Sequence, residues 1–163
     1  MTRMHSAEHP SDHVATAVYR SRLTVPESAI DANGHVNNVA YVQWMQDVAI
    51  EHFESTGCHQ AMDVAGGTWV ARYHHIEYLS PAFVGEELEA QTWVVRFRRV
   101  RTLRRYRFVR LSDGKELATG ETEWAFVDSS SGRPKAIPEA IRKAFLAASG
   151  SDSGLQPHGS AAD

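Results

Sequence analysis

Two hydrophobic periods alternate along this chain, and the change between them predicts its secondary structure. Ala15–Val25 is rich in Val, Tyr and Thr, alternates roughly between polar and apolar side chains, and is followed by Pro26, which predicts a strand. The segment Pro26–Gly34 carries the Asp, Asn and Gly residues that are typical of turns. A loop is therefore expected between the first strand and the next element.

A long helix is predicted from Asn37 to Thr56. Its apolar residues recur at intervals of three and four, which places them on one face: Tyr41, Met45, Val48, Ala49 and Phe53. Asn37 or Asn38 can cap the start, and Gly57 sits where a left-handed residue commonly ends a helix.

The rest of the chain predicts four strands and a short helix. The strands are expected at Trp69–Leu79, Glu87–Val100, Leu103–Leu111 and Glu116–Val127, in hairpin succession, and the helix at Pro138–Ala147. The fold class is therefore α+β, with a five-stranded, mostly antiparallel sheet wrapped around one long helix. Unpaired sheet edges in such a fold favour self-association.

Length and composition are those of one domain. The chain has 163 residues, of which 42% are apolar and 23% charged. The first 13 residues and residues 149–163 are polar and of low complexity, so both are expected to be disordered and the folded domain to span residues 14–148.

Charge and cysteine content restrict the functional classes. The net charge is −3, which argues against a nucleic-acid partner. The single cysteine, Cys58, excludes an internal disulfide and is expected to be a small buried thiol. The sequence shows neither a signal peptide nor an apolar run long enough for a membrane, so we expect a soluble, cytoplasmic protein.

The loop from Asp31 to Asn38 concentrates the candidate chemistry. It brings a carboxylate, several amides and an imidazole to the start of the long helix, where unpaired backbone N–H groups and a partial positive charge can stabilise a developing oxyanion. Asp31 could act as a nucleophile or as a general base on water. Asn33 and His35 could orient the substrate. Taken singly, however, each of these residues is also an ordinary turn or cap residue.

The string DANGHVNNVAY, residues 31–41, resembles the active-site signature of the hot-dog-fold acyl thioesterases, a class that includes 4-hydroxybenzoyl-CoA and acyl-ACP thioesterases. It is similar to the D-x-N-x-H-V-N-N run of the acyl-ACP enzymes. The segments IEYLSP at residues 76–81 and GEEL at residues 85–88 are similar to the second strand of that family and the turn after it. Matching features extend over about Val18 to Ala147, in the strand, helix and strands order of a hot-dog fold.

The resemblance implies a function and its residues. It implies an acyl thioesterase of fatty acid metabolism, acting on an acyl-CoA or acyl-carrier-protein thioester, with its site formed between the subunits of a homodimer or homotetramer. Asp31 falls on the catalytic carboxylate of the family, Asn33 and His35 on its polar partners, and the Asn38 backbone N–H on its oxyanion donor. It implies no cofactor beyond coenzyme A as part of the substrate.

The sequence also departs from the family. Ala29 stands where the acyl-CoA branch often has an acidic residue, two positions before the catalytic one. The second catalytic domain of the large acyl-ACP enzymes has no counterpart, which weakens the case for a specialised acyl-ACP enzyme.

Eight arginines lie between Arg96 and Arg110. They can form a solvated sheet face balanced by glutamates on neighbouring strands, or a surface for coenzyme A phosphates, a carrier protein or a nucleic acid. His74 and His75 point to opposite faces of a strand, and no metal-binding motif is present, so no metal site is expected.

Two other functions remain open. A hot-dog acyl-CoA hydratase or dehydratase would also hold the thioester carbonyl at the helix start. A non-catalytic acyl-thioester binding protein would bind without turnover.

Overall fold

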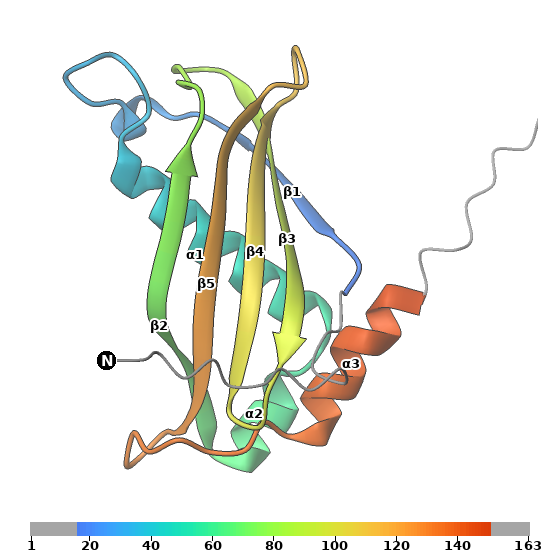
Figure 1. The fold of residues 1–163 in the computed structure, drawn as a ribbon. Helices are drawn as coiled ribbons and strands as arrows, with labels where there is room; N and C mark the ends of the chain where they lie inside the picture. The colour runs from blue at the N-terminus through green and yellow to red at the C-terminus, as the bar shows by residue number, and fades with distance from the viewer. Residues whose placement is uncertain (1–15, 151–163) are drawn as a thin grey trace, which may run out of the picture.

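The computed structural model describes residues 16–150 and contains one sheet and three α-helices (Figure 1). The strands are β1 (Tyr19–Thr24), β2 (Gly67–Tyr78), β3 (Glu87–Phe97), β4 (Arg101–Arg110) and β5 (Glu116–Asp128); the helices are α1 (Asn38–Ser55), α2 (His59–Ala65) and α3 (Glu139–Gly150), with a short 3₁₀ helix at Glu27–Ala29. The predicted α+β class and the predicted strands and long helix are confirmed. The segments expected to be disordered lie outside the described residues, apart from Ser149 and Gly150 in α3.

The strand order is β1-β3-β4-β5-β2, and every pairing is antiparallel. The predicted hairpin succession of the last four strands is therefore wrong at its first step, because β2 pairs with β5 and not with β3. The connection after β2 crosses the sheet instead. In this connection, the Ala82 carbonyl accepts a hydrogen bond from the Val36 N–H at 2.9 Å. The Gly85 N–H donates to the Val25 carbonyl, also at 2.9 Å. This crossing segment packs the loop before α1 against the sheet.

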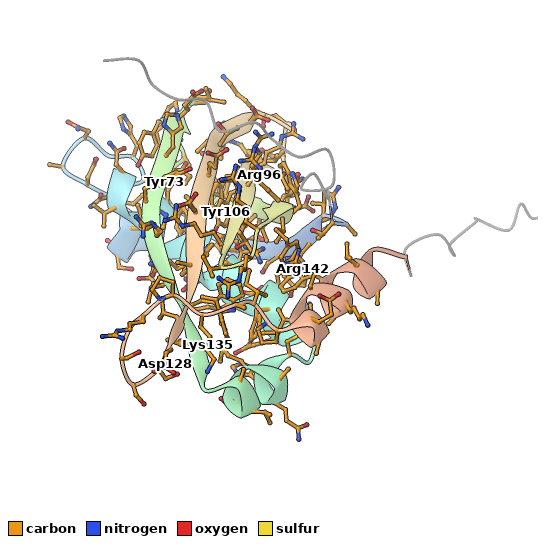
Figure 2. The ribbon with its side chains drawn as sticks, turned by 60° about the horizontal axis from the view of Figure 1, so that its bottom comes forward. Tyr73, Arg96, Tyr106, Asp128, Lys135 and Arg142 are labelled. Atoms are coloured by element: carbon orange, nitrogen blue, oxygen red, sulfur yellow. The ribbon has the colours of Figure 1, made fainter. Side chains whose placement is uncertain are left out.

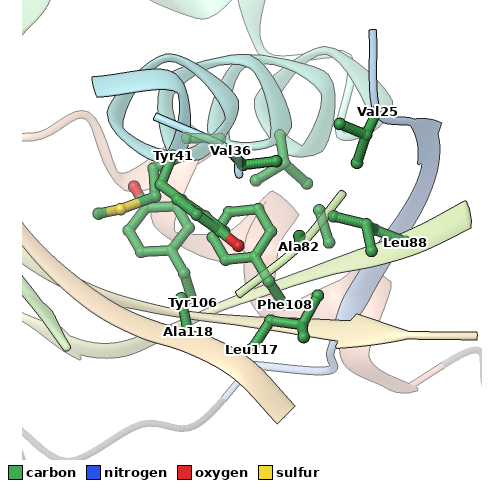
Figure 3. Packing of buried hydrophobic residues seen from close by; sticks show 13 residues of the cluster. Val25, Val36, Tyr41, Ala82, Leu88, Tyr106, Phe108, Leu117 and Ala118 are labelled. Atoms are coloured by element: carbon green, nitrogen blue, oxygen red, sulfur yellow. The ribbon is translucent and has the colours of Figure 1, made fainter. Parts of the chain in front are cut away.

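Helix α1 runs along one face of the sheet, and its apolar side forms the main core (Figures 1 and 3). Tyr41, Met45, Val48 and Ala49 are buried, as the spacing of three and four predicts. Tyr41 meets Phe108 of β4 edge-on, with ring centroids 5.2 Å apart. Phe53 is only partly buried, and His52 takes the inward position beside it.

The ends of α1 follow the predicted signals. The Asn37 side-chain oxygen accepts a hydrogen bond from the Val39 N–H, 2.8 Å, which is an N-cap. Gly57, two residues after the helix, has a φ of 72°, the left-handed conformation that glycine adopts most easily.

A second core lies where α2 and α3 close one end of the fold. It joins Phe97, Phe126 and Phe145, and it includes Cys58, which is buried as predicted. The Arg142 guanidinium of α3 lies over the Phe97 ring at 5.4 Å and donates to the Arg98 carbonyl (Figure 2). Helix α2 was not predicted, because seven residues are too few to show a periodic pattern.

Ion pairs cover much of the outer face of the arginine-rich strands. Arg105 pairs with Glu121 at 3.3 Å and Arg101 with Glu123 at 3.2 Å, as the reading of a balanced, solvated sheet face predicts. After β5, Asp128 and Lys135 form a further pair at 3.6 Å (Figure 2). Within residues 16–150, no helix combines the length and the apolar character needed to cross a membrane.

Candidate active site

The loop from Ile30 to Val36 is a tight turn closed by backbone hydrogen bonds. Ile30 and Val36 form an isolated antiparallel bridge. Inside it, the Asp31 N–H donates to the His35 carbonyl at 2.9 Å, and the Gly34 N–H donates to the Asp31 carbonyl at 3.0 Å. Gly34 has a φ of 81°, which glycine adopts without strain, so the turn can fold back on itself directly before the helix.

Asp31 is partly exposed, and only one of its two carboxylate oxygens accepts a hydrogen bond within residues 16–150. Its Oδ1 accepts a hydrogen bond from the Asn33 N–H at 2.8 Å, the Asx turn that stabilises such loops. Its second oxygen accepts no hydrogen bond from the residues that the structure describes. That oxygen is free to act on a water molecule or on a substrate carbon.

Among the first three backbone N–H groups of α1, those of Asn38, Val39 and Ala40, one has no hydrogen bond within residues 16–150. The Asn37 N–H donates to the Ala29 carbonyl, the Val39 N–H to the Asn37 side chain, and the Ala40 N–H to the Asn37 carbonyl. The Asn38 N–H is the one that donates to no acceptor among these residues. The free donor at the positive end of the helix is thus the one that the sequence predicts as the oxyanion donor.

A cavity of about 230 Å³ opens beside this helix start. His35, Asn38, Tyr41 and Tyr78 contribute to its lining, together with residues 79–82. The Tyr78 hydroxyl donates to the Asn38 carbonyl at 2.9 Å and so fixes the end of β2 against the helix.

The Tyr41 hydroxyl is buried in the same region and has no hydrogen-bond partner among the described residues. Burial and the nearby Glu86 raise the pKa of Tyr41 to about 12, so the hydroxyl stays protonated and can donate at neutral pH. It provides a second polar group close to the helix start.

The four predicted site residues are not all brought to one place. His35 and Asn38 line the same cavity, and Asp31 is tied to His35 through the backbone. Asn33 is exposed in the turn, and its described hydrogen bond is made by its backbone N–H. His35 lies edge-on to Phe83, 5.9 Å between ring centroids. The catalytic roles of these residues stay predictions.

A larger cavity, about 570 Å³, lies between the carboxyl-terminal half of α1 and the sheet. Its lining is mostly apolar and aromatic, including Ile50, Phe53, Trp69, Val94, Trp124 and Phe145. This size and character are typical of a pocket for an organic group. Two tryptophans, Trp69 and Trp124, contribute to the lining.

Two residues of these cavities were not identified as site residues from the sequence. Tyr78 was included only as part of a strand, and its contact with α1 depends on the tertiary fold. Arg104 was grouped with the solvated arginines, although its alternation with Thr102, Tyr106 and Phe108 was a signal that it faces the helix. Within residues 16–150, no group of three His, Cys, Asp or Glu side chains is placed to hold a metal.

Comparison with known proteins identifies the family. Residues 25–145 match the model of the thioesterase-like superfamily. A protein of Agrobacterium fabrum (strain C58), named L-carnitine dehydrogenase/betainyl-CoA thioesterase, is 28% identical over 116 residues, which are 71% of this chain. The match spans only 24% of that relative.

Solved structures share the fold. The Staphylococcus aureus protein SAV2348, solved in complex with CoA, is 18% identical with a TM-score of 0.75, over 91% of this chain and 97% of its own. A 1,4-dihydroxy-2-naphthoyl-CoA thioesterase from Synechocystis is 14% identical with a TM-score of 0.72, over 79% of this chain and 96% of its own. The fold is therefore the hot-dog fold that the sequence predicts. With most of its length matched by the family model, the chain belongs to the thioesterase-like superfamily.

Proposed function

We propose that this protein is a thioesterase that hydrolyses an acyl-CoA to the free acid and coenzyme A. The observation that carries the proposal is the free Asn38 N–H at the start of α1. It follows directly on the turn that holds Asp31, whose carboxylate has one oxygen without a hydrogen bond from the described residues. In a member of the thioesterase-like superfamily, these two groups suit the two needs of thioester hydrolysis: stabilisation of an oxyanion and activation of a nucleophile.

In the proposed reaction, the thioester carbonyl oxygen accepts the Asn38 N–H. This bond strengthens as the oxygen becomes negative, and one such donor contributes about 3–4 kcal/mol to the transition state. Asp31 either takes a proton from a water molecule that attacks the carbonyl carbon, or attacks that carbon itself and forms an anhydride that water then hydrolyses. In both routes the proton released from water is available to the departing thiolate. The C–S bond then breaks, and coenzyme A leaves as the thiol. Both roles for Asp31 fit its free oxygen.

The proposed site is completed by a second copy of the chain, paired through the free edge of β2. Val70 and Tyr73 are 42% and 46% exposed on this strand, whereas the other edge strand, β1, presents Arg20 and Arg22. Two β2 strands paired antiparallel about a two-fold axis would bring the Tyr78 end of one beside the Thr68 end of the other.

This pairing would also join the two cavities. Asn38 and Tyr78 line the smaller cavity at one end of β2, and Thr68, Trp69 and Val70 line the larger at the other end. The catalytic groups of one subunit would therefore meet the apolar cavity of the other, which could receive the acyl group. A carrier-protein substrate, a cytoplasmic location and a place in fatty acid metabolism remain predictions of the sequence.

A thiol-release assay over short, long and aromatic acyl-CoA substrates tests the proposal when free acid and free thiol are measured together. We expect equal amounts of acid and thiol from at least one substrate. A hydratase would consume enoyl-CoA without releasing thiol, and a binding protein would bind acyl-CoA without turnover. Either result would overturn the proposed hydrolysis.

A further inference from the structure

Arg104 differs from its neighbouring arginines because it points toward α1. Its side chain is 5% exposed, whereas Arg105 and Arg107 lie on the outer face and pair with Glu121 and Glu116. Burial lowers the pKa of the Arg104 guanidinium, but an arginine still carries its charge at neutral pH. A buried charge is costly unless an opposite charge or several hydrogen bonds compensate for it.

The groups around Arg104 are neutral. Its Nη1 donates to His52 Nδ1 at 2.9 Å and to Thr92 Oγ1 at 3.1 Å, and its guanidinium lies 5.8 Å from the centroid of the Phe145 ring. His52 cannot supply a negative charge, and burial together with Arg104 lowers its pKa to about 3, so it is neutral. Within residues 16–150, no carboxylate pairs with Arg104, and no group accepts a hydrogen bond from its Nε or Nη2.

Arg104 also lines the larger cavity, where it is the one permanent charge in the described lining. No Asp or Glu contributes to that lining. His59, the other titratable lining residue, is exposed and lies 3.7 Å from Glu54. The cavity thus combines aromatic and aliphatic walls with an uncompensated positive charge.

We propose that this cavity binds the acyl group of a thioester whose far end is a carboxylate, with Arg104 as the residue that recognises it. The substrate class is then the mono-CoA ester of a dicarboxylic acid. The inference rests on the proposed thioesterase function for its catalytic consequence, but not for binding. A carboxylate can accept charge-assisted hydrogen bonds from the free N–H groups of a guanidinium, and an acyl group with a positive end is disfavoured by the same charge.

Hydrolysis of paired substrates tests the specificity. Adipoyl-CoA and suberoyl-CoA are compared with hexanoyl-CoA and octanoyl-CoA, which have the same chain lengths without the second carboxylate, and with the cationic betainyl-CoA. We expect kcat/KM for the carboxylated member of a pair to be higher by at least about 10-fold, and betainyl-CoA to be the poorest substrate. An equal or reversed preference would overturn the proposal.

Variants assign the preference to Arg104. Arg104→Met should remove it by lowering kcat/KM for suberoyl-CoA at least about 10-fold more than that for octanoyl-CoA, and Arg104→Lys should retain part of it. A folded Arg104→Met enzyme with the preference of the wild type would contradict the assignment. If Arg104→Met does not fold, the wild-type comparison and the binding measurement still decide.

Binding of unreactive ligands separates this inference from the proposed function. Calorimetric titration of the wild type with the monoamide of suberic acid and with octanamide requires no catalysis. In both ligands an amide takes the place of the thioester, and only the first has a carboxylate at its far end. We expect the suberic acid monoamide to bind at least about 10-fold more tightly. Tighter binding of the monoamide by a protein that hydrolyses no thioester would retain the inference and reject the function. Hydrolysis of octanoyl-CoA by a protein that binds both amides equally would retain the function and reject the inference.

Discussion

His52 makes stability depend on pH through a single side chain. Its pKa is about 3 in the folded protein, because of burial and Arg104, against about 6.5 in an unfolded chain. Between these values the unfolded state binds the extra proton, so the free energy of unfolding falls as the pH decreases from 6.5 toward 3. At pH 4.5 this amounts to about 2–3 kcal/mol relative to neutral pH.

Urea unfolding at pH 7 and pH 4.5 measures this effect against His52→Gln, whose amide oxygen can still accept the Arg104 hydrogen bond. The carboxylates titrate in the same way in both proteins, so the difference between the two losses in free energy of unfolding reports on His52 alone. The wild type should lose about 2–3 kcal/mol more than the variant between the two pH values. Equal losses would show that His52 is not buried in the neutral form.

Single residues were predictable from sequence where their role is local. Asn37 caps the helix, and Gly57 takes a left-handed conformation directly after it, because both effects depend on a few neighbouring backbone groups. Arg104 and His52 were not predicted as partners, since they lie 52 positions apart and meet only when α1 packs on β4. The free Asn38 N–H was predicted through the family resemblance.

At the scale of elements, the cap of α1 determines both stability and the geometry of the site. Asn37→Ala removes the acceptor for the Val39 N–H and should lower the free energy of unfolding by about 1 kcal/mol. Because Asn37 precedes the proposed oxyanion donor, kcat should fall as well. Asn37→Ser, which can still cap, is the matched control in urea unfolding and in the thiol-release assay. An alanine variant as stable as the serine variant would contradict the role of the cap.

The elements themselves were largely predictable, but their neighbours were not. The hydrophobic periods located α1 and all five strands within a few residues. The hydrophobic periods do not determine which strands pair. The prediction therefore placed β2 beside β3, whereas in the structure β2 lies beside β5. The crossing segment around Ala82 and Gly85 is held by contacts with Val36 and Val25, which are distant in the sequence.

At the scale of the whole molecule, the proposed site is complete only in a dimer that pairs through β2. Tyr73→Glu places like charges near the proposed two-fold axis, where two copies of the residue would face each other, and this opposes pairing. Light scattering should show a dimer for the wild type and a monomer for the variant, with activity lower by about 10-fold or more because neither site is complete.

Val64→Glu, an equally charged change on the exposed α2 surface, is the control and should stay dimeric and active. A fully active monomer of the Tyr73→Glu variant would show that one chain suffices.

The central claim is that Asp31 is the catalytic carboxylate of a thioesterase, and thiol release by Asp31→Asn tests it most directly. Asparagine can still accept the Asn33 N–H, so the turn should be kept, and the unfolding midpoint should match the wild type. Asp63→Asn makes the same chemical change on an exposed residue outside both cavity linings. We predict that kcat falls by about 100-fold or more in Asp31→Asn and is unchanged in Asp63→Asn. A folded Asp31→Asn enzyme with activity within about 2-fold of the wild type would contradict the account.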